Sequence, residues 1–119
     1  MSDELTVSGN VTFIKGSTSV SFGKTGLTFD VSGTKHAHVL HTVGTSEEAL
    51  LKGDVDTPGL LAIYNRDATN YAMYRPALAG ADTVKILPGE LAIFRCATTS
   101  PYLIANTLPV DLEYLLIEA

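Results

Sequence analysis

From residue 60 onward the chain consists of short apolar segments separated by turn-forming residues. The segments cover residues 60–64, 71–74, 83–87, 91–95, 102–105 and 110–117. None is long enough for a core helix, and short strands at this spacing are typical of a two-sheet sandwich or jelly roll. We therefore predict an all-β fold: a single-domain antiparallel β-sandwich or jelly roll with at most one short helix.

The composition adds a question about the surface. The chain has 119 residues, enough for one domain, and 45% of them are apolar whereas 18% are charged. Ordinary soluble chains have about 25% charged residues. Either the sandwich is thin and holds most of its mass inside, or partner subunits cover part of its surface. The sequence leaves both interpretations open.

The charge pattern argues against two classes of partner. The net charge is -5 and the isoelectric point about 4.9, and the few lysines and arginines are scattered along the chain. Binding to a nucleic-acid backbone or to an anionic membrane surface needs a basic patch. We expect neither direct nucleic-acid binding nor membrane binding.

The single cysteine and the polar N-terminus bear on the compartment. Cys96 has no partner for an intramolecular disulfide, which fits assembly in a reducing cytoplasm. We expect it to be a small buried hydrophobic residue that follows a strand. Residues 1–4 are acidic and polar, with no apolar stretch behind them, so we expect no signal peptide.

The first third of the chain has a different residue pattern. It contains three strand-like segments in which apolar side chains alternate with Thr or Ser, at residues 11–14, 19–22 and 27–31. Glycines mark the expected turns at positions 16, 23, 26 and 33. We assign residues 1–26 to an N-terminal arm or hairpin strands and residues 27–119 to the sandwich body. Such an arm can pair with the sheet edge of a neighbour. Alternatively, these are simply the first strands of the same sandwich.

Residues 35–43 predict a strand with two distinct faces. The face expected to look inward carries Ala37, Val39, His41 and Val43. Residues 45–53 then resemble a short helix, with Thr45 as N-cap, Glu48 in capping-box position and Gly53 at the end. An extended segment is the alternative, because two turns of helix are marginal without tertiary packing.

The last strand, residues 110–117, changes character along its length. One face is apolar throughout and carries Val110, Leu112, Tyr114 and Leu116. The other face begins with Asp111 and Glu113 and continues with Leu115 and Ile117. This pattern predicts a strand that is exposed on one side at its start and buried on both sides at its end.

The only constellation that suggests metal chemistry is His36-Ala37-His38. Two histidines at this spacing point to the same side of a strand and could share a metal, and the pair is similar to the first motif of the cupins. The carboxylate that completes that motif is missing, since Glu47 is too far along the chain, and no histidine follows Pro88–Glu90, where the second motif would need one. His41 points to the opposite face. A catalytic metal needs three ligands and an open position, so we predict surface or interface histidines and no metal site.

Other sites are not supported by the sequence. There is no nucleophile elbow, no phosphate-binding loop and no calcium loop. The five tyrosines mostly occupy alternating strand positions, which favours packing in a core or interface over a sugar-binding platform. We predict no catalytic, cofactor-binding or metal-ligating residues, no cofactor, and a protein that is not an enzyme.

Three segments of the body carry a resemblance. Asn65-Arg66-Asp67-Ala68-Thr69-Asn70-Tyr71, Leu87 to Arg95 with its Pro-Gly-Glu turn, and the acidic, aliphatic strand from Asp111 to Glu118 resemble a family of small virion proteins of phages and prophages. Residues 29–35 also fit the earlier part of that family. The resemblance covers about residues 27–119, and its motifs consist of turns and strands and carry no chemistry.

The resemblance implies a β-sandwich subunit of a tailed-phage particle. On phage heads, small jelly-roll proteins are commonly cement or decoration subunits, which stabilise the lattice of the major capsid protein. We therefore expect a virion structural protein on the capsid surface, assembled in the host cytoplasm. Its expected partners are the major capsid protein and itself, as dimer or trimer, with residues 1–26 making contact with the capsid or a neighbour.

Three alternatives remain open at this point. The protein could be a tail, fibre or baseplate subunit, a cupin-like metal- or ligand-binding protein, or a lectin-like receptor-binding module. The sequence assigns no role to His36, His38 or His41.

Overall fold

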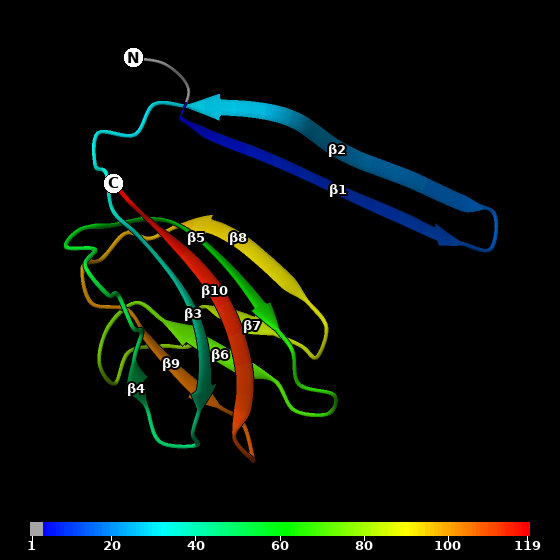
Figure 1. Ribbon diagram of the computed structural model, residues 1–119. Coiled ribbons are helices and arrows are strands. Elements are labelled where there is room, and N and C mark those ends of the chain that lie inside the picture. Colours follow the sequence, from blue (N-terminus) through cyan, green and yellow to red (C-terminus); the bar gives the residue numbers. More distant parts are fainter. Residues whose placement is uncertain (1–3) are drawn as a thin grey trace. The chain divides into compact units, whose positions relative to one another are not determined.

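The computed structural model describes residues 4–119. Residues 1–3, which begin both the polar N-terminus and the expected N-terminal arm, lie outside the described residues. Residues 4–119 form ten strands and contain no helix (Figure 1). No helix that could cross a bilayer occurs in this range. The chain divides into two units, Met1–Ser32 and Gly33–Ala119, which we describe separately.

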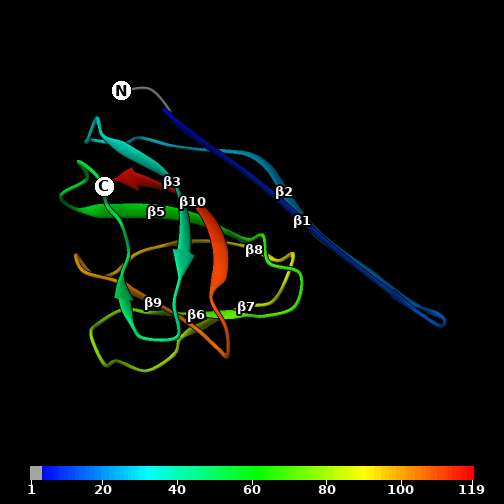
Figure 2. The same ribbon diagram turned by 60° about the horizontal axis from the view of Figure 1, so that its bottom comes forward.

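The larger unit, which we call the body, contains eight strands in two layers. They are β3 (His36–Val43), β4 (Glu48–Ala49), β5 (Pro58–Asn65), β6 (Ala72–Arg75), β7 (Val84–Ile86), β8 (Leu91–Arg95), β9 (Tyr102–Ala105) and β10 (Val110–Glu118). One antiparallel sheet has the order β3-β10-β5-β8 and the other the order β4-β9-β6-β7. Figure 2 shows β5 in one layer and β6 and β7 in the other.

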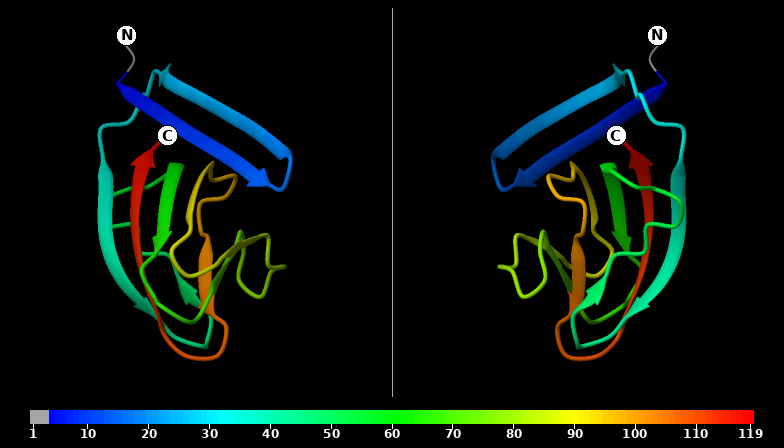
Figure 3. Two further views of the ribbon diagram at one scale, coloured as in Figure 1. Left: turned by 90° about the vertical axis from the view of Figure 1, so that its right-hand side faces the viewer. Right: turned by 90° about the vertical axis from the view of Figure 1, so that its left-hand side faces the viewer.

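This strand order is that of a jelly roll. Neighbours within each sheet are mostly not consecutive in the chain, so the chain crosses repeatedly from one sheet to the other. In Figure 3, left, the first sheet can be followed from β3 through β10 and β5 to β8. Eight strands wound into two such sheets are the jelly-roll arrangement. The predicted all-β sandwich is confirmed.

The core lies between these two sheets and follows the predicted alternation. On β3 and β10 the side chains assigned to the inner face are buried or half-buried. Tyr74 of one sheet packs edge-on against Phe94 of the other, with ring centroids 4.8 Å apart. Cys96 is buried directly after β8, as predicted, and burial raises the pKa of its thiol. The fully enclosed side chains include Val43, Leu61, Ile63, Leu103, Val110, Leu112 and Leu116.

The short helix predicted for residues 45–53 is wrong. This segment is extended and contains β4, which pairs with β9, and the Leu50 N–H donates to the carbonyl oxygen of Pro101 at 3.0 Å. The Glu48 carboxylate accepts the Gly44 N–H at 2.7 Å, so it closes a turn instead of capping a helix. The edge of the second sheet offered these residues better hydrogen-bond partners than two isolated helical turns could.

The prediction that β10 becomes buried on both sides is also wrong. Its inner face is buried along its length, but Leu115 on the other face is 38% exposed and Ile117 is only half-buried. An apolar residue in a position that the sequence marks as buried has therefore been left in contact with solvent in the single chain.

The smaller unit contains a long antiparallel hairpin. Strand β1 (Leu5–Lys15) pairs along its length with β2 (Thr18–Phe29) in a two-stranded sheet of its own. Gly16 and Ser17 form the connecting loop, and Gly16 has a φ of 60°, the positive value that a two-residue type II′ hairpin turn requires at its first central position.

The hairpin differs in detail from the sequence analysis. The segments 19–22 and 27–31, which we expected to be separate strands with turns at Gly23 and Gly26, belong mostly to the single strand β2. Residues 27–29, assigned to the body by sequence, therefore continue the hairpin, and the division between the units falls after Ser32. Neither β1 nor β2 belongs to a sandwich sheet.

Candidate functional site

One face of the hairpin carries a row of mainly apolar side chains, interrupted by the Gly9–Lys24 pair, which we call the apolar stripe. Residues directly opposite each other in an antiparallel pair point to the same side. The opposed pairs on this side are Leu5–Phe29, Val7–Leu27, Val11–Phe22 and Phe13–Val20. The opposite face carries mainly hydroxyl and amide groups, including those of Thr6, Asn10, Thr12, Ser19 and Ser21.

A β-bulge keeps this stripe on one face. The pairing passes from Val7–Leu27 to Gly9–Lys24, so β2 holds one more residue than β1 at this point. Gly26 has a φ of 66°, and its N–H donates to Ser8 Oγ at 2.9 Å. A glycine with positive φ is typical of such bulges. Without the extra residue, strict alternation would place Leu27 and Phe22 on opposite faces.

The stripe is open to solvent. Phe22 is 67% exposed, Val11 65% and Phe13 51%. Exposed apolar rows of this length are rare on soluble monomers and mark interaction surfaces. A two-stranded hairpin is also marginally stable by itself in water. The stripe is therefore a surface that a partner would complete.

The second exposed apolar surface is on the body. We call the side of the β3-β10-β5-β8 sheet that faces away from the core the outer face. Two rows of side chains cross its centre, and polar residues, including Thr42, Asp111 and Arg95, lie beyond them. The rows are His38, Leu115, Ala62 and Ile93, and Leu40, Glu113, Tyr64 and Leu91. Six of the eight are apolar or aromatic, whereas an antiparallel sheet with one solvated face normally alternates apolar and polar side chains.

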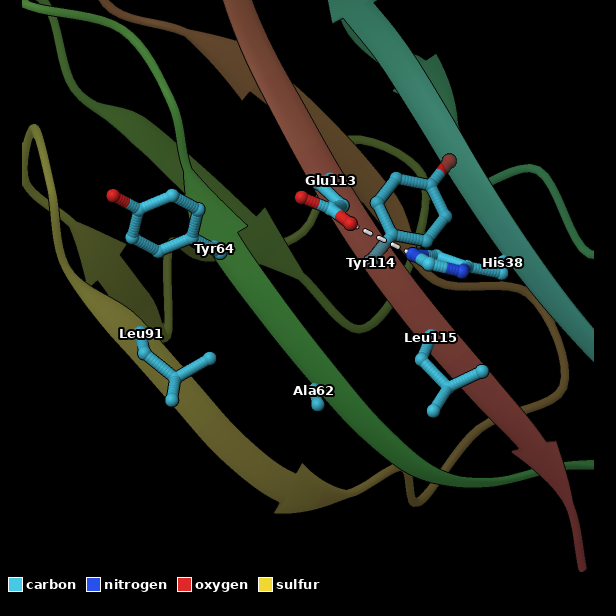
Figure 4. A pocket seen from close by; sticks show the side chains of 7 residues that line it. All are labelled: His38, Ala62, Tyr64, Leu91, Glu113, Tyr114 and Leu115. Carbon is cyan, nitrogen blue, oxygen red and sulfur yellow. Dashed lines mark hydrogen bonds and ion pairs between the residues drawn. The ribbon is translucent and has the colours of Figure 1, made fainter.

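One ion pair lies within this outer face. His38 Nε2 is 2.8 Å from Glu113 Oε2, and the two side chains are 60% and 38% exposed. They border a shallow depression of about 320 Å³, lined also by Tyr64, Leu91 and Leu115 (Figure 4). A depression of this kind suits a side chain from a partner better than a small ligand, which needs a more enclosed pocket.

The third histidine has a structural role. His41 points inward, as predicted, and its ring lies between Tyr114 and Glu48: Nδ1 is 2.9 Å from the Tyr114 hydroxyl and Nε2 is 3.0 Å from Glu48 Oε1. The Tyr114 hydroxyl also accepts the Leu51 N–H at 3.0 Å. This arrangement fits a neutral ring that accepts at Nδ1 and donates from Nε2. The network fixes the chain around β4 to β3 and β10.

The histidines are thus distributed over two faces of β3. His36 and His38 share the outer side and His41 the inner side, so the strand does not bring all three together. In the part of the chain that the structure describes, no group of three His, Cys, Asp or Glu side chains is placed to hold a metal ion. The tyrosines also divide: Tyr74 and Tyr114 are buried in the core, while Tyr64 lies on the outer face.

Two of the motifs that carry the family resemblance are joined to each other by hydrogen bonds. The Asn65 N–H donates to the Glu90 carbonyl, and the Gly89 N–H donates to the Asn65 carbonyl. Asn65 is fully buried, and its side-chain amide donates to the Ile86 and Asn70 carbonyls. These residues of the two resembling segments therefore hold two turns together.

Searches with this chain of protein-family models, of curated proteins and of solved structures find no match. The two exposed apolar surfaces are therefore the features from which a function can be inferred.

The parts of these surfaces are visible in the sequence, but their extent is not. Alternation of apolar residues with Thr or Ser gives residues 19–22 and 27–31 one apolar side each, and it does not show that the two sides coincide, because the bulge that aligns them depends on pairing with β1. The signal for the outer face was present in Leu115, whose apolar side chain the sequence analysis assigned to a buried position.

Proposed function

We propose that this protein is a non-enzymatic structural subunit of a tailed-phage particle, a capsid cement or decoration subunit that binds the lattice of the major capsid protein. One observation carries the proposal: a jelly roll with a complete core of its own is joined to a long hairpin whose apolar stripe is exposed. The resemblance of residues 27–119 to small virion proteins supports the phage particle as the setting.

The stripe offers enough area for a useful contact. Eleven residues at about 3.3 Å each and two strands about 4.8 Å apart give a face of about 36 Å by 10 Å, or about 360 Å². Burying an apolar surface of that size contributes about 9 kcal/mol before the costs of association are subtracted. A contact of this strength is modest for one subunit, but many copies on one shell would act together.

The body supplies a rigid block for such a role. Its core residues all lie between Ala37 and Leu116, so the jelly roll does not depend on the hairpin for its own packing. A stable block with a projecting apolar segment suits a subunit that joins others.

The test is binding to heads of the encoding phage that lack this protein. Val11→Asp places a charge on the apolar stripe, while Ile14→Asp places the same charge on the opposite face of the same strand. The two side chains are 65% and 70% exposed, so neither change removes a core residue. We expect V11D to lose head binding and I14D to retain it.

Binding is measured by co-sedimentation of purified protein with heads, and hydrogen exchange of the β1 and β2 amides confirms that the hairpin persists in both variants. If V11D saturates heads as well as wild type does, the stripe is not the attachment surface. If wild type binds tails and not heads, the protein is a tail, fibre or baseplate subunit and the cement proposal is wrong.

A further inference from the structure

We infer that the outer face of the body is the docking site for the apolar stripe of a second copy of this chain. This inference rests on the proposed function, in that it names the neighbour to which the hairpin of an assembly subunit attaches. It joins the two exposed apolar surfaces described above, the apolar stripe and the outer face, each of which is exposed in the single chain.

Charge complementarity favours a second copy as the occupant. The hairpin from Leu5 to Phe29 contains two lysines and no acidic residue, giving it a net charge of +2. The body from Gly33 to Ala119 contains ten acidic and six basic residues, giving it a net charge of -4. Opposite potentials favour association of a hairpin with a body and disfavour contact of two hairpins or of two bodies.

The charges are also placed where the two surfaces would meet. Lys24 pairs with Gly9 on the same side as the stripe, with its Nζ 5.4 Å from the centre of the Phe22 ring. On the outer face, Glu113 lies between Leu40 and Tyr64 in its row and pairs with His38 at 2.8 Å. Lys24 of a docked hairpin would bring a second cation to this carboxylate.

The dimensions of the two surfaces allow contact along the strands. Strands β3 and β5 have eight residues each, so at about 3.3 Å per residue the outer face is about 26 Å long, and four strands about 4.8 Å apart make it about 19 Å wide. About 26 Å of the stripe, which is about 10 Å wide, can therefore lie on one outer face, an area of about 260 Å². One hairpin on one outer face would bury about 520 Å² in total, which is below the range of specific interfaces, whereas a reciprocal pair would bury about 1,000 Å², the least that a specific interface needs.

The area argument therefore predicts a closed assembly. In a two-fold dimer each copy gives its hairpin and receives that of its partner, so that both apolar surfaces of both copies are covered. A closed trimer, in which each hairpin lies on the next body, covers them equally well. A one-way contact would leave one stripe and one outer face exposed and would continue into filaments.

Sedimentation of the full-length protein tests the inference without any phage particle. Leu91→Asp puts a charge on the outer face, and Leu108→Asp puts one in the loop before β10; the two side chains are 60% and 61% exposed. We expect wild type to sediment as a dimer or trimer, L108D to do the same, and L91D to dissociate with a Kd raised by about thirtyfold or more. A wild-type monomer, or an L91D variant that associates like L108D, would overturn the inference.

Cross-linking between labelled copies identifies the contact itself. A photoreactive phenylalanine analogue replaces Phe22, and the protein is assembled from an equal mixture of nitrogen-15-labelled and unlabelled copies. We expect mixed-isotope cross-links from position 22 to residues of β8 or β10. Cross-links within one copy, or between two hairpins, would contradict the inference. Sedimentation and cross-linking test the contact between copies in the absence of heads, whereas binding of the wild-type protein to heads or to tails tests the proposed function. Failure of the inference and failure of the proposed function are therefore distinguishable.

Discussion

Replacing Tyr114 with phenylalanine removes a single hydroxyl from a part-buried hydrogen-bond network of the body. Tyr114 is 1% exposed, and its hydroxyl accepts the Leu51 N–H at 3.0 Å while lying 2.9 Å from His41 Nδ1. Burial raises the pKa of Tyr114 to about 12, so the hydroxyl keeps its proton at neutral pH and is able to donate it to His41. The phenylalanine ring fills the same volume and leaves no cavity.

The size of the effect follows from the groups that lose their partner. The Leu51 N–H and His41 Nδ1 are left without the hydroxyl, and the His41 side chain is only 10% exposed, so water does not readily replace it. A buried polar group without a partner costs about 1–3 kcal/mol. We expect Y114F to lower the free energy of unfolding by about 2–4 kcal/mol, a large part of the roughly 5–15 kcal/mol typical of one domain.

Urea denaturation at pH 7, followed by circular dichroism, measures this loss. Tyr64→Phe is the matched control, because Tyr64 lies on the outer face and is 39% exposed; its stability should stay within about 0.5 kcal/mol of wild type. A loss below about 0.5 kcal/mol for Y114F as well would refute the reasoning. It would mean that the network around His41 does not hold the segment containing β4 in place.

Two further predictions concern a carboxylate and a glycine. The hydrogen bond from the Gly44 N–H and, as a smaller cause, the interaction with His41 lower the pKa of Glu48 below its ordinary value of 4.5. The ionised Glu48 carboxylate therefore stabilises the folded state above pH 4.5, and this stabilisation is lost as the pH falls through the lowered pKa of the folded protein. Glu48→Gln should therefore be less stable than wild type at neutral pH, with a difference that narrows on acidification; equal urea midpoints at all pH values would contradict this. Gly26→Ala should make the β2 amides exchange with solvent hydrogen about 5–30 times faster, because a side chain at positive φ costs about 1–2 kcal/mol. Gly9→Ala is the control and should leave the exchange rates unchanged, because Gly9 has an ordinary φ and open space around its Cβ. Equal exchange rates in the two variants would show that the bulge does not require glycine.

The layered fold could be predicted because its signals are local. Alternation with a period of two is set by neighbouring residues, and it correctly placed Val43 and His41 on the inner face of β3 and Leu112 on the inner face of β10. The turn residues around Asn65 and Gly89 likewise ended their strands where expected. Such features need no knowledge of what lies across the sheet.

The errors arose where tertiary partners decided the outcome. Glu48 satisfies the pattern of a helix cap, but in the structure its carboxylate is hydrogen-bonded to the Gly44 N–H and to His41. The Leu50 N–H donates to the carbonyl oxygen of Pro101, which directly precedes β9. The apolar residues on the two sides of the bulge share one face of the hairpin only because of that bulge, and the bulge exists only when β1 and β2 are paired. Neither choice is visible in a local window of sequence.

The error at Leu115 is the most informative for function. An apolar residue at that position indicated burial, and the single chain leaves it 38% exposed. If the outer face is covered in an assembly, the expectation of burial at Leu115 describes the assembled protein instead of the isolated one. The composition of the chain, rich in apolar and poor in charged residues, then finds its explanation in partner contacts as well as in the core.

Under the proposed function, electron cryomicroscopy of the phage particles that would carry this protein tests the central claim most directly. We predict jelly-roll density on the outside of the head, seated over contacts between major capsid protein subunits, with each hairpin lying against a neighbouring molecule. Particles that carry the protein only in the tail, or purified particles that lack it altogether, would contradict the account.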